Sequence, residues 1–247
     1  MISVCMAVFN GERYLKEQLQ SILMQLDNDD EVIIVDDCSR DGSIDLIKQL
    51  NDPRIILQRN QANCGPSASF ERAIALAKGK YILLSDQDDI WQSCKVATIC
   101  GIFDSTTSLA VVSDASVVDD NGNVVFESMF SLRGSRPGFW RNLYKNGFVG
   151  CCMAIRCDAK SFLFPFPTNA GMHDEWIGLC SSIGGRISFS GNKLIQYRRH
   201  EANVTQLAHG SLPSMVCKRL KLFFVVLCRL PRILIWRVRR GKSQLAD

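Results

Sequence analysis

Two apolar segments of this chain end in clusters of aspartate, and this pattern restricts the fold more than any other feature. The run 31–35 is followed by Asp36 and Asp37, and the run 81–84 leads into Asp86, Asp88 and Asp89. Continuous apolar runs of this length are typical of strands buried on both faces of a parallel sheet. In open α/β sheets, ligands bind beyond the carboxyl ends of the strands. The sequence therefore predicts an α/β fold with both acidic clusters on one binding edge.

Strand and helix patterns alternate along the first part of the chain. We predict strands at 2–8, 31–35, 54–57 and 81–84, and helices at 14–23, 43–50 and 67–77. Such alternation indicates βαβ units and a mostly parallel central sheet flanked by helices. Further along, the patterns favour strands at 109–114, 148–155 and 193–199, a hairpin turn at 119–123 and a helix at 173–183. The economical organisation is one domain, residues 1–212, followed by a basic tail, residues 213–247.

The charge of the chain is divided unevenly between these two parts. Residues 215–247 hold nine of the 29 basic residues and one of the 25 acidic ones, so the body carries −4 and the tail +8. An acidic body argues against a nucleic-acid binder, which needs a basic face for phosphates. The 11 cysteines are odd in number and have no paired C-x-x-C spacing, which predicts reduced thiols and no zinc site. Together with an N-terminus that does not resemble a signal peptide, this predicts a cytoplasmic location.

Three carboxylates within four residues repel one another and need a cation. Oxygen ligands at the spacing of Asp86 and Asp88 suit Mg²⁺ or Mn²⁺ held partly by the phosphates of a substrate. An EF-hand is excluded, because its loop glycine would fall on Trp91. The competing interpretation is a solvated acidic turn, since aspartate is common in turns.

Several segments together resemble the signatures of family 2 glycosyltransferases with the GT-A fold. These segments are Val8-Phe9-Asn10-Gly11, the stretch from Val35 to Ser43, the stretch from Ser85 to Trp91, Asn146-Gly147-Phe148-Val149-Gly150, Met172-His173-Asp174-Glu175-Trp176 and Tyr197-Arg198-Arg199-His200. The resemblance covers roughly residues 1–205 in the family's order and spacing. The segment after His200 departs from the pattern, because it lacks the glycine that often closes it. A Gln-x-x-Arg-Trp processivity motif is also missing, which implies transfer of a single sugar.

The resemblance implies roles for individual residues. Asp174 would be the catalytic base, whereas without the family match a helix-start aspartate would be the favoured interpretation. The nucleotide sugar would be bound by Phe9, Asn10, Asp37, Asp86 and Asp88, with Asp37 on the nucleobase. A divalent cation, Mn²⁺ or Mg²⁺, would be bound by Asp88, Asp89 and His200. How Asp86, Asp88 and Asp89 divide these roles stays open at this point.

The implied reaction is inverting transfer of a hexose from a nucleotide sugar to a polyprenyl-diphosphate-linked saccharide. UDP-glucose or UDP-galactose is the favoured donor, and GlcNAc or GalNAc the favoured acceptor sugar, in synthesis of O-antigen or another bacterial surface polysaccharide. A dTDP-rhamnose rhamnosyltransferase of the same pathway is the alternative. In a different class, a non-catalytic nucleotide-binding module would keep the strand-end carboxylates but would need neither Asp174 nor His200.

The tail is predicted to form an amphipathic helix that lies on the membrane. Its basic residues between Lys218 and Arg240 project onto one side of a helix, and the opposite side would carry Leu220, Phe223, Leu227, Leu230 and Leu234. The apolar run 222–228 is far shorter than the roughly 20 residues that span a bilayer. We therefore expect a peripheral protein on the cytoplasmic face of the bacterial inner membrane. The alternative is a C-terminal helix packed on the body.

Overall fold

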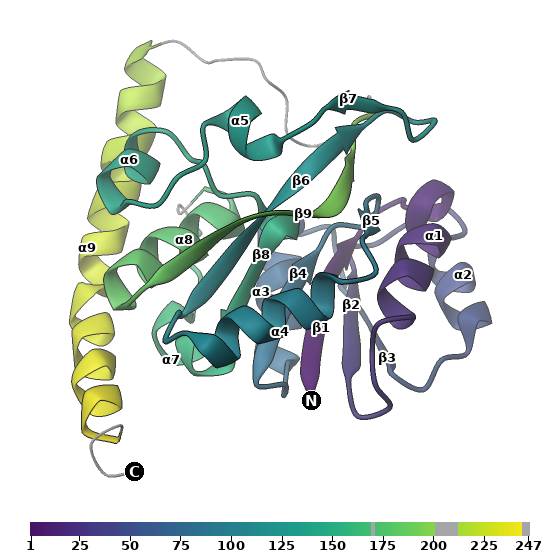
Figure 1. Ribbon diagram of the computed structural model, residues 1–247, viewed down its shortest axis with the longest axis horizontal. Coiled ribbons are helices and arrows are strands. Elements are labelled where there is room, and N and C mark those ends of the chain that lie inside the picture. The colour runs from purple at the N-terminus through teal and green to yellow at the C-terminus, as the bar shows by residue number, and fades with distance from the viewer. Residues whose placement is uncertain (169–170, 201–211, 244–247) are drawn as a thin grey trace.

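A single curved sheet with helices on both sides forms the body of the protein in the computed structural model (Figure 1). The structure describes residues 1–168, 171–200 and 212–243. Within these ranges the sheet has nine strands in the order β3-β2-β1-β4-β8-β6-β9-β5, with β7 paired to β6. This arrangement confirms the predicted α/β class.

The first half of the sheet is parallel, as the sequence predicts. It contains β1 (Ile2–Val8), β2 (Glu31–Asp36), β3 (Ile55–Arg59) and β4 (Tyr81–Ser85). The connecting helices are α1 (Glu12–Leu23), α2 (Ser43–Leu50) and α3 (Pro66–Leu76). Strands β2 and β4 are buried along their whole length, which explains their unbroken apolar sequences. Because β2 and β4 flank β1 in the same direction, the two acidic segments that follow them leave the same edge of the sheet.

The second half of the sheet is mixed. Its strands are β5 (Ile90–Trp91), β6 (Ala110–Val118), β7 (Val124–Phe126), β8 (Met153–Arg156) and β9 (Ile187–Arg198). Strand β8 runs antiparallel to β4 and β6, whereas β9 runs parallel to β6. The predicted turn at 119–123 joins β6 to the antiparallel β7 and is confirmed. The helices of this half are α4 (Lys95–Ser105), α5 (Met129–Arg133), α6 (Phe139–Tyr144), α7 (Lys160–Leu163) and α8 (His173–Gly184).

The strand predicted at 148–155 is wrong in its first half. Residues Gly150–Cys152 form a 3-10 turn, η1, and only Met153–Arg156 enter the sheet; a second short turn, η2, covers Cys157–Ala159. The chain bends at η1 because it passes directly beneath α8. A Cβ atom on Gly150 would lie 2.7 Å from Nε2 of His173. Small apolar residues at 150–152 therefore mark a close approach and not a strand.

The tail forms one long helix, α9 (Leu212–Ser243), that packs along α6, α7 and α8 (Figure 1). Leu222, Val226 and Ile233 are buried against the body, while Leu220, Leu227 and Leu234 are exposed. The predicted separation of basic and apolar sides is wrong in part, because Arg229 turns inward and donates to the carbonyl oxygens of Phe162, Phe164 and Pro165. Helical periodicity alone does not tell which side meets the body. Among the described residues, no helix is apolar over a length sufficient to cross a bilayer.

Candidate active site

The loop that follows β1 is tied to the loop that follows β2. Asn10 donates its backbone N–H to Oγ of Ser39 over 2.9 Å, and its side-chain oxygen accepts from the backbone N–H of Arg40 over 2.9 Å. Its backbone is left-handed, with φ 51°, a conformation that asparagine tolerates better than most residues. The side chain predicted to bind the nucleotide sugar therefore also fixes the shape of the edge. Phe9, just before it, is 44% exposed at this edge.

A second link joins the β1 loop to the acidic segment after β4. The side-chain oxygen of Gln87 accepts from the backbone N–H of Phe9 over 2.8 Å, and its amide nitrogen donates to the Phe9 carbonyl over 3.1 Å. Gly11 makes this approach possible, because a Cβ atom there would lie 2.5 Å from the Gln87 side-chain oxygen. Three loops thus form one connected rim at the carboxyl ends of β1, β2 and β4.

Asp37 lies at this rim but is fully engaged with the chain itself. One carboxylate oxygen accepts from the Asn60 amide over 2.7 Å and from the Cys64 N–H over 2.8 Å. The other oxygen accepts from the Gly65 N–H over 2.7 Å. Asp37 therefore holds the segment before α3 in place, and contact with a nucleobase stays a prediction.

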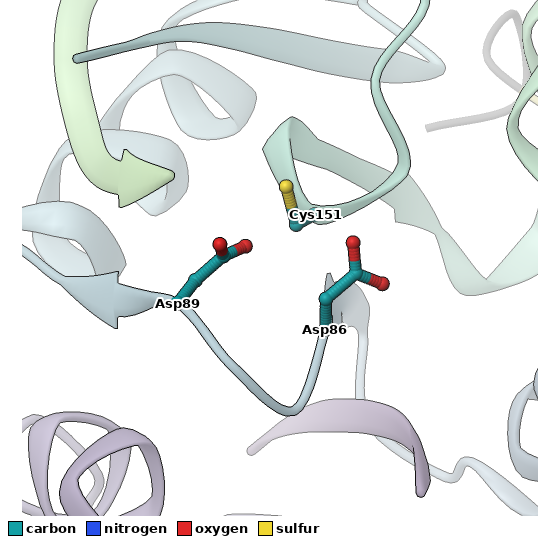
Figure 2. A group of neighbouring side chains, drawn as sticks. All are labelled: Asp86, Asp89 and Cys151. Carbon is teal, nitrogen blue, oxygen red and sulfur yellow. The ribbon is translucent and has the colours of Figure 1, made fainter. Parts of the chain in front are cut away.

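Two of the three aspartates after β4, Asp86 and Asp89, lie in a partly enclosed cluster with Cys151 of η1 (Figure 2). Ligand atoms of Asp86, Asp89 and Cys151 lie within 4.8 Å of one another. Burial raises the pKa of Asp86 to about 7, and repulsion from Asp88 and Asp174 adds to the shift. Burial likewise raises the pKa of Asp89 well above its usual range, with Asp88 and Asp86 adding to it. A positive charge beside these carboxylates would offset their mutual repulsion and favour their ionised forms.

Two cations of the chain stand behind this cluster. Lys95, the first residue of α4, is buried, donates to the Cys151 carbonyl over 2.8 Å and lies 3.9 Å from the centre of the Trp91 ring. Burial lowers its pKa to about 8, opposed by the nearby thiols and carboxylates. Arg198 at the end of β9 donates its backbone N–H to Asp89 over 3.0 Å and its Nε to the Asp88 carbonyl over 3.1 Å. Arg198 therefore holds the acidic loop, whereas Lys95 holds the turn that carries Cys151.

His200 lies beside the acidic loop, and its role as a metal ligand stays a prediction. Its Nε2 lies 2.9 Å from a carboxylate oxygen of Asp88, and its ring stacks on Tyr14 of α1 with the ring centres 4.9 Å apart. Burial raises the pKa of Asp88, and the hydrogen bond to His200 opposes this rise. The residue is therefore positioned by α1 against the acidic loop and is not a solvated histidine.

Asp174 lies in the first turn of α8 and is only 8% exposed. One of its carboxylate oxygens accepts from the N–H of Glu175 over 2.7 Å, and the Asn146 amide lies 3.5 Å from the other. Its negative charge contributes to the raised pKa of Asp86, so the two carboxylates share one electrostatic environment. Next to it, His173 is buried and stacks on Phe70 of α3, with ring centres 4.0 Å apart. Burial lowers the pKa of His173, which favours a neutral ring beside Asp174.

The acidic cluster fits a hard divalent cation. Among the described atoms, Oδ2 of Asp89 is buried without a hydrogen-bond partner, so one carboxylate oxygen is available as a ligand. The pKa of the Cys151 thiol is raised well above its usual range, first by its hydrogen bond with Cys152 and then by burial. A neutral thiol is a poor ligand, and the remaining donors are carboxylate oxygens and one imidazole. Such a set suits Mn²⁺ or Mg²⁺ better than zinc or copper(I).

Most of the residues predicted from the sequence meet at this edge, and a few others were missed. Phe9, Asn10, Asp86, Asp88, Asp89 and His200 form the connected rim and the acidic cluster, with Asp174 electrostatically adjacent. Sequence reasoning missed Cys151, Lys95 and the role of Gln87. The small residues at 150–152 signalled a close approach without showing what approaches. A lysine at a helix start gave no sign of burial.

Solved structures with the same fold define the class of protein. The chain superposes on Staphylococcus aureus TarS 1–349 in complex with UDP-GlcNAc with a TM-score of 0.70 and 21% identity, over 92% of this chain and 66% of TarS 1–349. It also superposes on the mannosyltransferase PcManGT of Pyrobaculum calidifontis, in complex with GDP-Man and Mn²⁺, with a TM-score of 0.60 and 16% identity, over 98% of this chain and 75% of that chain. The fold is therefore the GT-A fold of nucleotide-sugar transferases.

Sequence comparison places the chain within that class. Residues 3–163 match the family model "Glycosyl transferase family 2", and the chain belongs to this family. An uncharacterized glycosyltransferase of Nostoc sp., alr2836, is 29% identical over 211 residues, covering 82% of this chain and 66% of the relative. Two Escherichia coli relatives are both named UDP-Glc:alpha-D-GlcNAc-diphosphoundecaprenol beta-1,3-glucosyltransferase. WfgD is 25% identical over 170 residues (67% of this chain, 64% of WfgD), and WfaP is 33% identical over 97 residues (39% of each). The chain thus matches two thirds or less of the length of these relatives.

Proposed function

We propose that this protein transfers one hexose, with inversion, from a UDP-sugar to a saccharide linked to polyprenyl diphosphate, in the synthesis of a bacterial surface polysaccharide. The observation that carries the proposal is the closeness of the acidic cluster to the first turn of α8. A Cβ atom on Gly150, the residue before Cys151, would lie 3.7 Å from Cβ of Asp174, and the charge of Asp174 contributes to the raised pKa of Asp86. A donor diphosphate and an acceptor hydroxyl would meet between them. The names of the E. coli relatives support the donor and acceptor classes.

The donor would be held along the connected rim. Phe9, Asn10 and Asp37 would contact the nucleoside, and the acidic loop would face the diphosphate. Asp86, Asp88, Asp89 and His200 would hold the divalent cation, with Asp86 also near the ribose. When bound, Mn²⁺ or Mg²⁺ would stabilise the negative charge on the leaving diphosphate.

Asp174 would accept the proton of the attacking hydroxyl. The acceptor oxygen forms a bond to the anomeric carbon while the bond from that carbon to the diphosphate oxygen breaks, and the proton passes to the Asp174 carboxylate. The Asn146 amide and the Glu175 N–H orient the two carboxylate oxygens. One direct displacement inverts the anomeric centre, so an α-linked donor yields a β-linked product.

A donor screen tests this proposal. UDP-glucose, UDP-galactose and dTDP-rhamnose are each incubated with the protein, Mn²⁺ or Mg²⁺, and synthetic polyprenyl-diphosphate acceptors carrying GlcNAc or GalNAc. We expect a β-linked disaccharide from a UDP-hexose, identified by NMR, and no product after exhaustive EDTA treatment. Transfer of rhamnose alone would make the protein a rhamnosyltransferase of the same pathway. UDP binding without turnover of any donor would favour a non-catalytic nucleotide-binding module.

The acceptor class also implies where in the cell the protein acts. Polyprenyl carriers reside in the membrane, so the protein would act at the cytoplasmic surface of the inner membrane as a peripheral enzyme. The screen with a water-soluble acceptor of short lipid chain, run beside the long-chain acceptor, separates the chemistry from the membrane requirement.

A further inference from the structure

The side of α9 that faces away from the body is apolar. Between its first and last described turns it exposes Leu220, Phe224, Leu227, Leu234, Ile235 and Val238. These residues follow one another at spacings of mostly three or four, so they form a strip along one helix face. Phe224 is 61% exposed, although residues on the other side of the same helix, such as Val226, are fully packed. The helix is therefore apolar on two opposite sides, and only one of them has a partner in the fold.

Helix α6 widens this strip with two aromatic side chains. Trp140 is 70% exposed and Tyr144 is 82% exposed. The Trp140 ring lies 5.8 Å from the ring of Phe223, centre to centre, which places α6 beside the strip (Figure 1). Tryptophan and tyrosine are enriched where protein meets the lipid headgroups, because their rings combine apolar area with a polar group.

Exposed basic side chains border the apolar strip. On α9 these are Lys218, Lys221, Arg232, Arg237 and Arg239; Arg141 lies on α6, and Lys145 follows α6 directly. The sequence of α9 contains no aspartate or glutamate. Lys221, Arg232 and Arg239 fall on one line of the helix, along the edge of the strip opposite to α6. The surface therefore combines apolar contact area with a uniform positive charge.

From this combination we infer that the outer side of α9, with Trp140 and Tyr144 of α6, docks on an anionic lipid bilayer. We call these residues the docking surface. Apolar residues and rings enter the headgroup region, and the bordering lysines and arginines contact anionic lipid. A second copy of the chain fits the surface poorly, since pairing two such surfaces would bring like charges together. The inference rests on the proposed function only for its biological purpose, because lipid binding needs no donor and no chemistry.

The docking surface is joined to the active site by a direct contact. Arg219, in the first described turns of α9, pairs with the carboxylate of Glu175, the residue after Asp174. Burial raises the pKa of Glu175, and the pairing with Arg219 opposes this rise. The helix that lies on the bilayer thus also contacts the first turn of α8. The docking surface is thereby linked, through α9, to the helix that carries the proposed base.

Vesicle binding tests the docking surface with the full chain and without nucleotide. Vesicles of phosphatidylglycerol and phosphatidylcholine should sediment the wild-type protein, with less binding in high salt and far less to phosphatidylcholine alone. The double variant Phe224→Glu with Ile235→Glu should bind at least about tenfold more weakly, because two apolar contacts are lost and two negative charges are gained. Val125→Glu, an equally exposed apolar residue on β7, is the matched control and should bind like wild type.

A second pair of variants tests the charges. Lys221→Gln with Arg239→Gln should weaken binding roughly tenfold to thirtyfold, whereas Lys16→Gln with Lys48→Gln, exposed on α1 and α2, should change it little. Binding by Phe224→Glu with Ile235→Glu equal to wild type would overturn the inference. A concentration-dependent dimer of the wild type that the same variant dissociates would also overturn it, in favour of a self-interface. Circular dichroism and thermal unfolding show whether each variant keeps its fold.

Activity separates this inference from the proposed function. On a water-soluble acceptor the docking-surface variants should keep near-normal turnover, and on vesicle-embedded acceptor they should lose at least about tenfold. Vesicle binding without any transferase activity would leave the docking surface standing and reject the proposed reaction. Full activity on vesicle-embedded acceptor without vesicle binding would reject the docking surface and leave the proposed reaction standing.

Discussion

The two aspartate clusters look alike in the sequence and differ sharply in the structure. Asp37, after β2, accepts three hydrogen bonds from Asn60, Cys64 and Gly65. Asp89, after β4, keeps a buried oxygen with no partner among the described atoms, and its pKa is raised by burial and by its neighbours. Both oxygens of the first carboxylate are satisfied by the chain, whereas one oxygen of the second has no partner among the described atoms. We expect this difference to separate a carboxylate that stabilises the fold from one that binds a ligand.

The largest effect we expect is at Asp174, which belongs to neither cluster. Asp174→Asn should lower kcat about a hundredfold to ten-thousandfold and leave donor affinity near normal, because the amide keeps the shape but does not accept the proton. Steady-state kinetics and donor binding by calorimetry measure the two quantities. Asp45→Asn, at an exposed position in the first turn of α2, is the control for the lost helix-start charge. Equal kinetics for both variants would show that Asp174 merely caps α8.

Asp88 tests whether the second cluster serves chemistry. Asp88→Ala should reduce transfer at least about a hundredfold while the unfolding free energy changes by less than about 1 kcal/mol, since the residue lies on a loop and removal of one charge relieves the crowding. Transfer assays at several Mn²⁺ concentrations and urea unfolding give both values. Asp29→Ala, on an exposed turn, should alter neither. Loss of stability in step with activity would place Asp88 with the structural carboxylates.

Substitution of Asp37 should lower the stability of the fold, in contrast to substitution of Asp88, which should mainly lower transfer. Asp37→Ala leaves two backbone N–H groups of the segment 64–65 without their acceptor, and we expect a loss of roughly 2 kcal/mol in unfolding free energy. Urea unfolding of the metal-free protein measures it. If stability is unchanged and only UDP affinity falls, then Asp37 is a nucleobase ligand and not a structural residue.

The smallest effect is a dependence of stability on pH in EDTA. The pKa of Asp86 rises from its ordinary value of 3.8 to about 7 on folding, so between these values the folded protein binds more protons than the unfolded chain. This contribution to stability is therefore complete below about pH 4 and is lost as the pH rises through about 7. Asp86→Asn should remove the dependence and should be more stable than wild type near pH 8. Urea unfolding near pH 4 and near pH 8 measures the difference.

Addition of Mn²⁺ should reverse the sign of the Asp86 effect. A bound cation favours the ionised carboxylate, so wild type would become more stable than Asp86→Asn above neutral pH. An identical pH profile for both proteins in EDTA would show that Asp86 is not crowded in the way its surroundings indicate.

The sequence predicted the parallel half of the sheet well, because each strand there carries its own local signal. Runs such as 31–35 are apolar on both faces and end in turn residues, and the structure places β2 within one residue of the prediction. The carboxyl-end rule then placed the acidic clusters on one edge without any knowledge of tertiary contacts. His200 was found only through the family pattern, since nothing local distinguishes it from an exposed histidine.

The rest depended on contacts between distant segments. The turn at 150–152 bends because α8 passes over it, and Lys95 is buried because the acidic loop and η1 close around it. The faces of α9 were partly wrong because periodicity shows that two sides differ without showing which one the body covers. Arg229, inside the predicted basic side, finds backbone carbonyls that no sequence pattern indicates.

Gln87 orders the two loops that follow β1 and β4. By donating to and accepting from the backbone of Phe9, one neutral side chain reproduces the pair of hydrogen bonds that joins neighbouring strands. The loops after β1 and β4 are thereby ordered during folding, before any nucleotide arrives. A donor bound along this rim, as proposed above, would therefore cost little conformational entropy there.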